Sequence, residues 1–193
     1  AKGWNVVGLA RHQEGMDENC RYVNWDGKTL GDWTKELDSC DAVLNLAGRS
    51  VNCRYNAENK AEITNSRVNS TRVIGEAIAA CGNPPELWMN ASTATIYKHS
   101  EDHPQSEEGE IGEGFSVGVA KAWEGAFFEA KVPGEVRKVA LRTSMVLADE
   151  PGTVYRYLLN LAKYGLGGKI GSGKQMVSWI HVEDVCRSID WLI

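Results

Sequence analysis

Three short motifs have the spacing of known chemical sites. Residues 114–118 (GFSVG) match G-x-S-x-G, the pattern around the serine nucleophile of many hydrolases. The glycines of residues 165–171 have the spacing of a dinucleotide-binding loop, and residues 168–175 (GKIGSGKQ) are similar to a phosphate-binding P-loop. Each site works only when a strand leads into the motif and a helix follows it, because that turn aims the nucleophile or the backbone amides at the ligand.

None of the three motifs has that context. Ser116 follows a solvated acidic stretch at residues 107–114, so a hydrolase is disfavoured. A helical pattern precedes residues 165–171 and a strand pattern follows them, which reverses the required order. Gln175 stands where a P-loop needs Ser or Thr to bind magnesium. We interpret this glycine-rich segment as a flexible loop over a site, where backbone can approach a ligand closely.

Metal and disulfide chemistry have little support in the sequence. His12, His99, His103 and His181 have no metal-ligand spacing with one another, and we predict no metal site. His181 ends an apolar strand pattern, which favours a hydrogen-bonded structural role over that of a catalytic base. The 5 cysteines are scattered without a C-x-x-C pair, which indicates reduced thiols in a cytosolic protein.

The elements that must position any site alternate along the chain. Strands are expected at residues 5–10, 21–25, 42–47, 87–92, 138–147 and 176–182. Helices are expected at residues 30–39, 56–81, 115–131, 153–164 and 185–193. The alternation predicts a doubly wound, Rossmann-like α/β fold, with a mostly parallel sheet and helices on both faces. The apolar run 42–47 is typical of a strand buried on both faces, and the polar loop 98–114 is long enough to suggest a functional role.

Composition limits the class of protein and its partners. The 193 residues are 42% hydrophobic and 24% charged, which suits one globular domain and excludes disorder. A net charge of -5 and a pI of about 5.4 argue against nucleic acid and anionic membranes as partners. No apolar stretch is long enough to span a bilayer and no signal peptide is visible, so we expect a cytoplasmic protein.

Both ends of the chain look like interrupted elements. Ala1, Lys2 and Gly3 resemble the end of a helix with its C′ glycine, and the last helical pattern is still amphipathic at Ile193. We therefore expect the chain to be an internal piece of a larger domain.

Several segments resemble one family. Residues 41–48 (DAVLNLAG) and 91–97 (ASTATIY) resemble the fourth-strand N-[LA]-A-G and fifth-strand S-[ST]-A-x-x-Y motifs of extended short-chain dehydrogenases/reductases. Residues 25–26, 60–71 (KAEITNSRVNST), 121–124 (KAWE) and 165–184 resemble the epimerase-like subfamily, often called sugar-nucleotide epimerases, within the NAD-dependent epimerase/dehydratase family. The resemblance covers essentially the whole chain.

The resemblance also bears on the two ends. A family member has a strand, a glycine-rich loop and a helix, about 25 residues in all, before the strand at residues 5–10. It also carries a C-terminal substrate-binding portion after the last helix. Residues 1–193 would therefore be a partial NAD(P)-binding Rossmann domain without that portion. The first strand lies centrally in the family's sheet, so its absence leaves backbone groups unpaired, and we expect marginal stability or a homodimer that pairs those edges.

The residue types at the end of the first strand pattern favour NADP over NAD. Family members that bind NAD have Asp or Glu there, which binds the ribose hydroxyls, whereas this chain has Ala10, Arg11 and His12. A guanidinium can pair with the 2′-phosphate that distinguishes NADP.

The resemblance implies further cofactor contacts. Asp26 would lie by the adenine, and Leu46, Ala47 and Gly48 would pass under the diphosphate and ribose, where small residues let the backbone come close. Glu62 and Arg67 would border the cofactor from one helix, and Val146 would pack near the nicotinamide. Those seven positions, with Ala10 and Arg11, form the predicted cofactor site.

The catalytic set departs from the broad superfamily, which uses a Tyr, a Lys four residues later and a nearby Ser or Thr. No tyrosine in this chain has Lys at that spacing. Alignment on Glu124 puts Ser116 at the Tyr position and Ala120 at the Lys position, while Thr93 occupies the Ser/Thr position. One of the three hydrogen-bonding roles is therefore kept and the acid/base pair is lost.

Three functions stay open on the sequence. The first is an NADP-dependent epimerase or reductase that acts on a nucleotide sugar or a similar hydroxyl or carbonyl substrate through Thr93. Its acid/base would be Ser116, Tyr97 or His181. The second is a non-catalytic module that binds or senses NADP, which the missing Tyr and Lys favour. The third is an inactive fragment, since the phosphate loop is absent.

Overall fold

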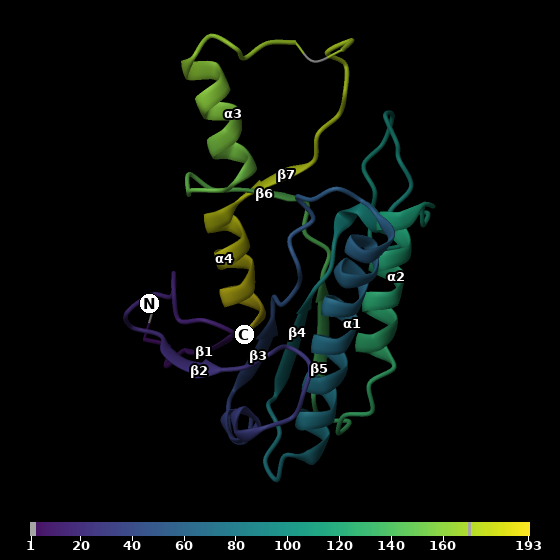
Figure 1. Cartoon of the computed structure of the whole chain (residues 1–193). Helices are drawn as coiled ribbons and strands as arrows, with labels where there is room; N and C mark the ends of the chain where they lie inside the picture. Colours follow the sequence, from purple (N-terminus) through teal and green to yellow (C-terminus); the bar gives the residue numbers. More distant parts are fainter. Residues whose placement is uncertain (1–2, 170) are drawn as a thin grey trace. The chain divides into compact units, whose positions relative to one another are not determined.

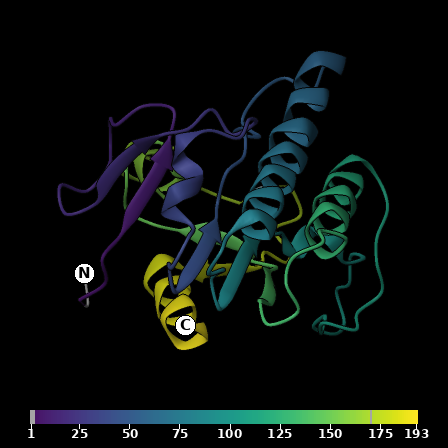
Figure 2. The same ribbon diagram turned by 90° about the horizontal axis from the view of Figure 1, so that it is seen from below.

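The computed structural model describes residues 3–169 and 171–193, which form two compact units. The first unit comprises Ala1–Ser92 and Glu113–Leu141, and the second comprises Thr93–Gly112 and Arg142–Ile193. The expectation that the chain opens on a helix end concerns Ala1 and Lys2, which lie outside the described residues. Each unit is described by itself below (Figures 1 and 2).

The first unit contains two parallel sheets. Strand β1 (Val7–Ala10) pairs with β2 (Arg21–Asn24), and β3 (Ala42–Asn45), β4 (Leu87–Ala91) and β5 (Arg137–Leu141) form the other sheet in the order β3-β4-β5. All of these pairings are parallel. The predicted Rossmann-like arrangement of mostly parallel strands and helices is confirmed.

Two long helices cover one side of the three-stranded sheet (Figures 1 and 2). Helix α1 (Ala57–Ala80) begins where Asn56 caps it, its side chain accepting a hydrogen bond from the Asn59 amide at 2.8 Å. Helix α2 (Phe115–Phe128) follows Gly114, whose φ of 99° favours glycine. A short 3-10 helix, η1 (Asp32–Glu36), lies between β2 and β3.

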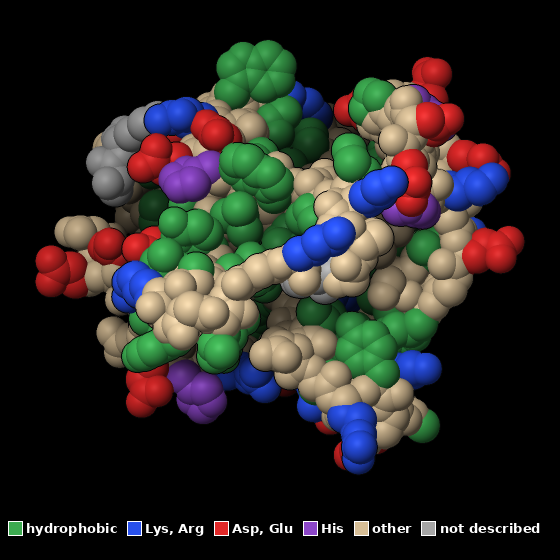
Figure 3. Space-filling model, turned by 90° about the horizontal axis from the view of Figure 1, so that it is seen from above, with side chains coloured by type: hydrophobic (Ala, Val, Ile, Leu, Met, Phe, Trp, Pro, Cys, Tyr) green, Lys and Arg blue, Asp and Glu red, His purple; other side chains and the backbone are tan. Residues whose placement is uncertain are grey.

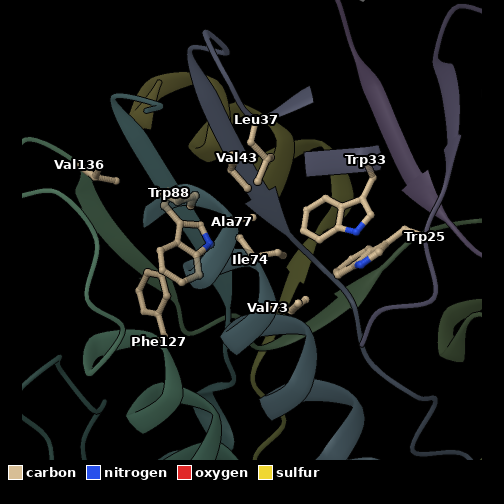
Figure 4. Close-up of a cluster of buried hydrophobic side chains, with 11 residues drawn as sticks. Trp25, Trp33, Leu37, Val43, Val73, Ile74, Ala77, Trp88, Phe127 and Val136 are labelled. Atoms are coloured by element: carbon tan, nitrogen blue, oxygen red, sulfur yellow. The ribbon is translucent and has the colours of Figure 1, made fainter. Parts of the chain in front are cut away.

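The core of the first unit lies between the sheet and α1 (Figure 4). Trp88 and Phe127 are fully buried and meet edge to face with ring centroids 4.6 Å apart. Trp25 and Trp33 form a second aromatic pair at 5.0 Å. The Trp33 indole donates to the Thr29 carbonyl at 2.9 Å, whereas the buried Trp25 and Trp88 indole nitrogens have no hydrogen-bond partner among the described residues.

The second unit is less densely packed. Strand β6 (Met145–Leu147) pairs in parallel with β7 (Trp179–His181), and the unit also holds the 3-10 helix η2 (Ala94–Ile96), α3 (Val154–Lys163) and α4 (Val182–Leu192). Neither α3 nor α4 has a buried residue. Hydrophobic side chains gather on the face seen in Figure 3. No helix among residues 3–169 and 171–193 has the length and apolar character needed to cross a bilayer.

Three expected elements are wrong in extent. The strand expected at 176–182 is reduced to β7 (Trp179–His181), because α4 already begins at Val182. The strand expected at 138–147 is divided into β5 and β6, because the chain leaves the sheet at Arg142 and the Thr143 carbonyl accepts the Ala94 amide at 2.9 Å. The helix expected at 30–39 is reduced to η1, whose N-cap Gly31 provides no side-chain capping bond.

The expectation that residues 42–47 are buried on both faces is also wrong. Val43 and Asn45 face α1 and are buried, whereas Leu44 is 37% exposed. Side chains alternate along a strand, and within the first unit α1 and α2 cover only the face that Val43 and Asn45 share.

The separate sheets of the first unit lead to a prediction about association. Among the described residues, β1 pairs only with β2 and β3 only with β4, so each has one edge of free backbone donors and acceptors. We expect the 193-residue chain to form a dimer through these edges or to melt at low temperature. Light scattering with calorimetry measures both. A monomer with a cooperative melt in the ordinary mesophilic range would contradict this expectation.

A second prediction concerns thiol reactivity. Burial raises the pKa of the Cys40 thiol from 9.0 to about 11, whereas Cys186 is exposed. Because the thiolate is the reactive form, we expect iodoacetamide at pH 8 to label Cys186 at least about tenfold faster than Cys40. Peptide mapping over time measures the two rates.

The same shift gives a pH dependence. Because the Cys40 pKa is raised in the folded state, the neutral thiol stabilises the fold below pH 9.0 and this contribution is lost as the pH rises toward about 11. In urea, where the chain is unfolded, the Cys40 and Cys186 thiols should react with iodoacetamide at similar rates. Equal rates in the folded chain would contradict the burial argument.

Candidate functional site

The turn that follows β3 presents its backbone at the surface of the first unit. Leu46 is 64% exposed and Gly48 is also exposed. The turn is held from within, because the Asn45 side-chain oxygen accepts the Ala47 amide at 3.0 Å. This turn contains three of the predicted cofactor residues.

Helix α1 holds the far end of the turn at Arg49. The Arg49 amide donates to the Ser66 hydroxyl at 3.0 Å, and its guanidinium donates to the Asn59 side-chain oxygen at 2.8 Å. The same guanidinium forms an ion pair with Glu62. Glu62 is therefore joined to the turn through Arg49, a residue that sequence reasoning missed although it directly follows the L-A-G motif.

Arg67 lies directly against the turn. Its Nη1 donates to the Arg49 carbonyl at 3.1 Å and to the Ile63 carbonyl at 3.0 Å. Burial lowers the pKa of Arg67 from its ordinary value, although a guanidinium stays charged at neutral pH. The Glu62 and Arg67 side chains, which the sequence alone would class as surface charges, thus both converge on residues 46–49.

The fit to a dinucleotide depends on Gly48. A Cβ at this position would come within 3.1 Å of the Arg67 guanidinium carbon, so a larger residue would require the Arg67 side chain to shift by a few tenths of an ångström. The combination of exposed small residues, accessible backbone and an adjacent cation suits the sugar and diphosphate of a nicotinamide dinucleotide. The residues present therefore fit such a cofactor.

The ends of β1 and β2 hold the other predicted cofactor residues. The Trp25 amide donates to the Ala10 carbonyl at 2.9 Å, and the Asn24 side chain donates to the Arg11 carbonyl at 3.2 Å. These bonds fix the backbone while the Arg11 side chain remains exposed. The exposed Arg11 guanidinium is accessible to an anionic ligand.

Asp26 is engaged in a local turn. Its carboxylate accepts the Lys28 amide at 2.8 Å, the Thr29 amide at 2.9 Å and the Thr29 hydroxyl at 2.8 Å. These bonds, the Thr29 amide first, lower the pKa of the carboxyl group. The exposed carboxylate is thus oriented by its own turn, and its role beside the adenine stays a prediction.

Helix α2 carries the positions aligned with the missing acid/base pair. Ser116 is exposed in the first turn of α2, and residues 112–114 lead into this helix as a loop, so Ser116 does not lie in the strand-to-helix turn of a hydrolase nucleophile. Ala120, at the position of the lysine, is 0% exposed. Glu124 is buried and accepts the Ser92 hydroxyl at 2.5 Å, which joins α2 to the end of β4.

The second unit holds Thr93 and Tyr97. Thr93 Oγ1 accepts the Thr95 amide at 3.2 Å and donates to the Thr95 hydroxyl at 2.9 Å, so it caps η2. Arg142 Nη1 donates to the Tyr97 hydroxyl at 2.8 Å and to the Glu107 carbonyl at 3.3 Å. Sequence reasoning missed Arg142, although a cation directly after an apolar strand is a usable signal.

The remaining predicted residues of the second unit are Val146 and His181. Val146 lies in β6 and is partly exposed. His181 is the N-cap of α4, where its Nδ1 accepts the Glu183 amide at 3.3 Å. This is the hydrogen-bonded structural role favoured by the sequence. Thr93 and Val146 belong to one unit and Ser116 to the other.

The polar loop forms a pocket of about 510 Å³ that is lined by residues 98–106, 109 and 110. Ser100 Oγ and Asp102 Oδ1 both contact His103 Nδ1, at 3.1 and 2.7 Å. A catalytic triad needs contacts on opposite imidazole nitrogens, so this arrangement is not one. The described residues contain no group of three or more metal-ligating side chains.

Comparison with known proteins decides the family. The sequence model of the NAD dependent epimerase/dehydratase family matches residues 1–193. The chain belongs to the NAD dependent epimerase/dehydratase family. Epimerase family protein SDR39U1 of Bos taurus is 33% identical over 190 residues, which cover 96% of this chain and 60% of the bovine protein. The chain thus spans less than two thirds of this relative's length.

Solved structures of family members agree in fold. The crystal structure of human SDR39U1 (isoform2) with NADPH has a TM-score of 0.82 and 29% identity, over 98% of this chain and 61% of that one. A nucleoside-diphosphate sugar epimerase from Corynebacterium glutamicum has a TM-score of 0.73 and 27% identity, over 96% of this chain and 37% of that one. This epimerase/dehydratase family member therefore shares the Rossmann-like fold of both.

Proposed function

We propose that the chain binds NADP, with NAD as the weaker ligand, and serves an epimerase or reductase that acts on a nucleotide sugar. The observation that carries the proposal is the convergence of Arg67, Gly48 and the Arg49–Glu62 pair on one exposed turn. The human relative solved with NADPH supports the cofactor. The sugar epimerase relative supports the substrate class, of which a related hydroxyl or carbonyl compound is the broader form.

The proposed binding roles divide between the two ends of the cofactor. Arg11 pairs with the 2′-phosphate, and Ala10 and Asp26 border the adenosine half. Residues 46–48 lie along the diphosphate and ribose, with Glu62 and Arg67 beside them. Val146 packs near the nicotinamide ring in this proposal.

The proposed chemistry depends on Thr93, which lies in the second unit. When bound, the nicotinamide exchanges a hydride with a substrate carbon. Thr93 orients the substrate hydroxyl, for which its contact with Thr95 must rearrange. Either Tyr97 or Ser116 exchanges the proton on that oxygen, because the hydroxyl groups of these two candidates do not cap a helix. His181 is a weaker proposal, because its Nδ1 caps α4.

One observation favours a second function, a module that binds NADP without catalysis. Ala120 occupies the position of the missing lysine. It is 0% exposed and has no group that could exchange a proton. An inactive fragment is the remaining alternative, and it predicts no NADP binding at all.

Turnover distinguishes these functions. The chain is incubated with NADP⁺ and a nucleotide sugar such as UDP-glucose, while absorbance at 340 nm and proton NMR follow reduced cofactor and new sugar epimers. The enzyme proposal expects product with wild type and Thr93→Ser, and at least about a hundredfold less with Thr93→Val. Saturable NADPH binding with no product from any sugar tested would favour the sensing module.

A further inference from the structure

We infer that Trp123 on α2 is a positioning residue for the turn at residues 46–49, which we call the cofactor turn. Its indole ring supports Arg67, and its N–H group is joined to Asn45 through Thr71. This inference rests on the proposed function. It assigns a role to a residue of the KAWE segment (residues 121–124), which directly follows Ala120, the position aligned with the usual lysine.

The ring of Trp123 supports Arg67. The Arg67 guanidinium carbon lies 5.1 Å from the ring centroid, within the range of a cation–π contact. Trp123 is only 6% exposed and Arg67 is half-buried, so water screens the contact weakly. Arg67 also donates to two carbonyls, at Arg49 and Ile63. The Trp123 ring and the two carbonyls together offset the loss of hydration of the Arg67 guanidinium and hold it beside the turn.

The indole nitrogen reaches the other end of the turn. Trp123 Nε1 donates to Thr71 Oγ1 at 3.0 Å, and Thr71 Oγ1 accepts from Asn45 Nδ2 at 3.2 Å. Asn45 also donates to Asn90 Oδ1 at 2.7 Å, and its own oxygen accepts the Ala47 amide at 3.0 Å. All of these side chains are buried, so the bonds are well shielded from competition by water.

Trp123 therefore closes a ring of contacts around residues 46–49. One branch runs through Thr71 and Asn45 to Ala47, and the other runs through Arg67 to Arg49. The chemistry of the two branches differs, because phenylalanine keeps an aromatic face but has no N–H donor. The two functions of the indole can therefore be separated by substitution.

The test compares two ligands that reach different parts of the site. Isothermal titration calorimetry measures binding of NADPH, which spans the turn, and of 2′,5′-ADP, which carries only the adenosine half and its phosphates. We expect Trp123→Leu to weaken NADPH binding about tenfold and to leave 2′,5′-ADP binding within twofold. Trp123→Phe, which loses only the N–H donor, should weaken NADPH binding about threefold. It supplies the test if Trp123→Leu fails to fold.

The matched control is Trp88→Phe. Trp88 is fully buried in the same unit and its indole nitrogen has no hydrogen-bond partner among the described residues. This variant should leave both affinities unchanged. In the Arg67→Gln background, Trp123→Leu should cause only about the threefold loss of NADPH affinity expected of Trp123→Phe, because the contact with Arg67 is already absent and only the branch through Thr71 is left to lose.

Three results would overturn the inference. Unchanged NADPH affinity in both Trp123 variants would remove the positioning role while the proposed function stands. Equal weakening of NADPH and 2′,5′-ADP, with a lower melting temperature, would make Trp123 a merely structural residue. Absence of NADPH binding by the wild-type chain would overturn the proposed function together with the inference.

Discussion

Replacing Arg11 with serine is expected to weaken NADPH binding by about 10- to 100-fold and to leave NADH binding within twofold. The two cofactors differ by the 2′-phosphate, and a hydrogen bond to a charged group contributes about 1.5–3 kcal/mol. The bond from Asn24 holds the Arg11 backbone, so the ordering cost of binding falls on the exposed side chain alone. The ratio of the two affinities therefore reports on this one contact.

Calorimetry with both cofactors measures that ratio. Arg72→Ser is the matched control, because Arg72 is an exposed arginine of the same unit that lies 3.8 Å from Glu76. It should alter neither affinity. Equal weakening of NADPH and NADH in the Arg11 variant would mean that Arg11 supports the fold or the adenine and does not select the cofactor.

Replacing Phe127 with alanine is expected to lower the free energy of unfolding by about 3–5 kcal/mol. Phe127 is 0% exposed and its ring centroid lies 4.6 Å from that of Trp88, so truncation opens a cavity in the core of the first unit. Since domains are stable by only about 5–15 kcal/mol, this single change removes a large part of the total.

The next residue in the chain is the control. Phe128 is 53% exposed on the same helix, and Phe128→Ala should cost less than about 1 kcal/mol. Urea unfolding followed by circular dichroism compares the two variants. Similar losses would show that the unit is not packed around Trp88 and Phe127 as described.

The sequence predicted the regular elements where local signals were strong. The pattern predicts the helix at 56–81 because its apolar residues recur on one face and Gly82 and Pro84 end it, and the structure has α1 at Ala57–Ala80. The run 138–147 was read as one strand because apolar and β-branched residues continue through it. The break at 142–144 depends on bonds to Tyr97 and Ala94, which are distant in sequence.

The candidate site was predictable only in part, and for a similar reason. The family resemblance indicated Glu62 and Arg67. Their residue types and their spacing on a helix would by themselves suggest ordinary surface charges. Arg49, Ser66 and Trp123 were missed because their roles consist of contacts between β3, α1 and α2. These contacts appear only when the elements pack.

The catalytic assignment has a different status. Pattern comparison located the missing Tyr and Lys at Ser116 and Ala120, and the structure adds that Ala120 is fully buried. Thr93, the third member, is a cap of η2. The acid/base therefore stays a matter of proposal, whereas the cofactor turn has a defined geometry.

The most direct test of the central claim is a titration of NADPH into the 193-residue chain followed by tryptophan fluorescence, for which its 7 tryptophans supply the signal. We predict saturable quenching by NADPH, with NADH binding more weakly. A linear response without saturation, or tighter binding of NADH, would contradict the claim that this chain is an NADP-binding member of its family.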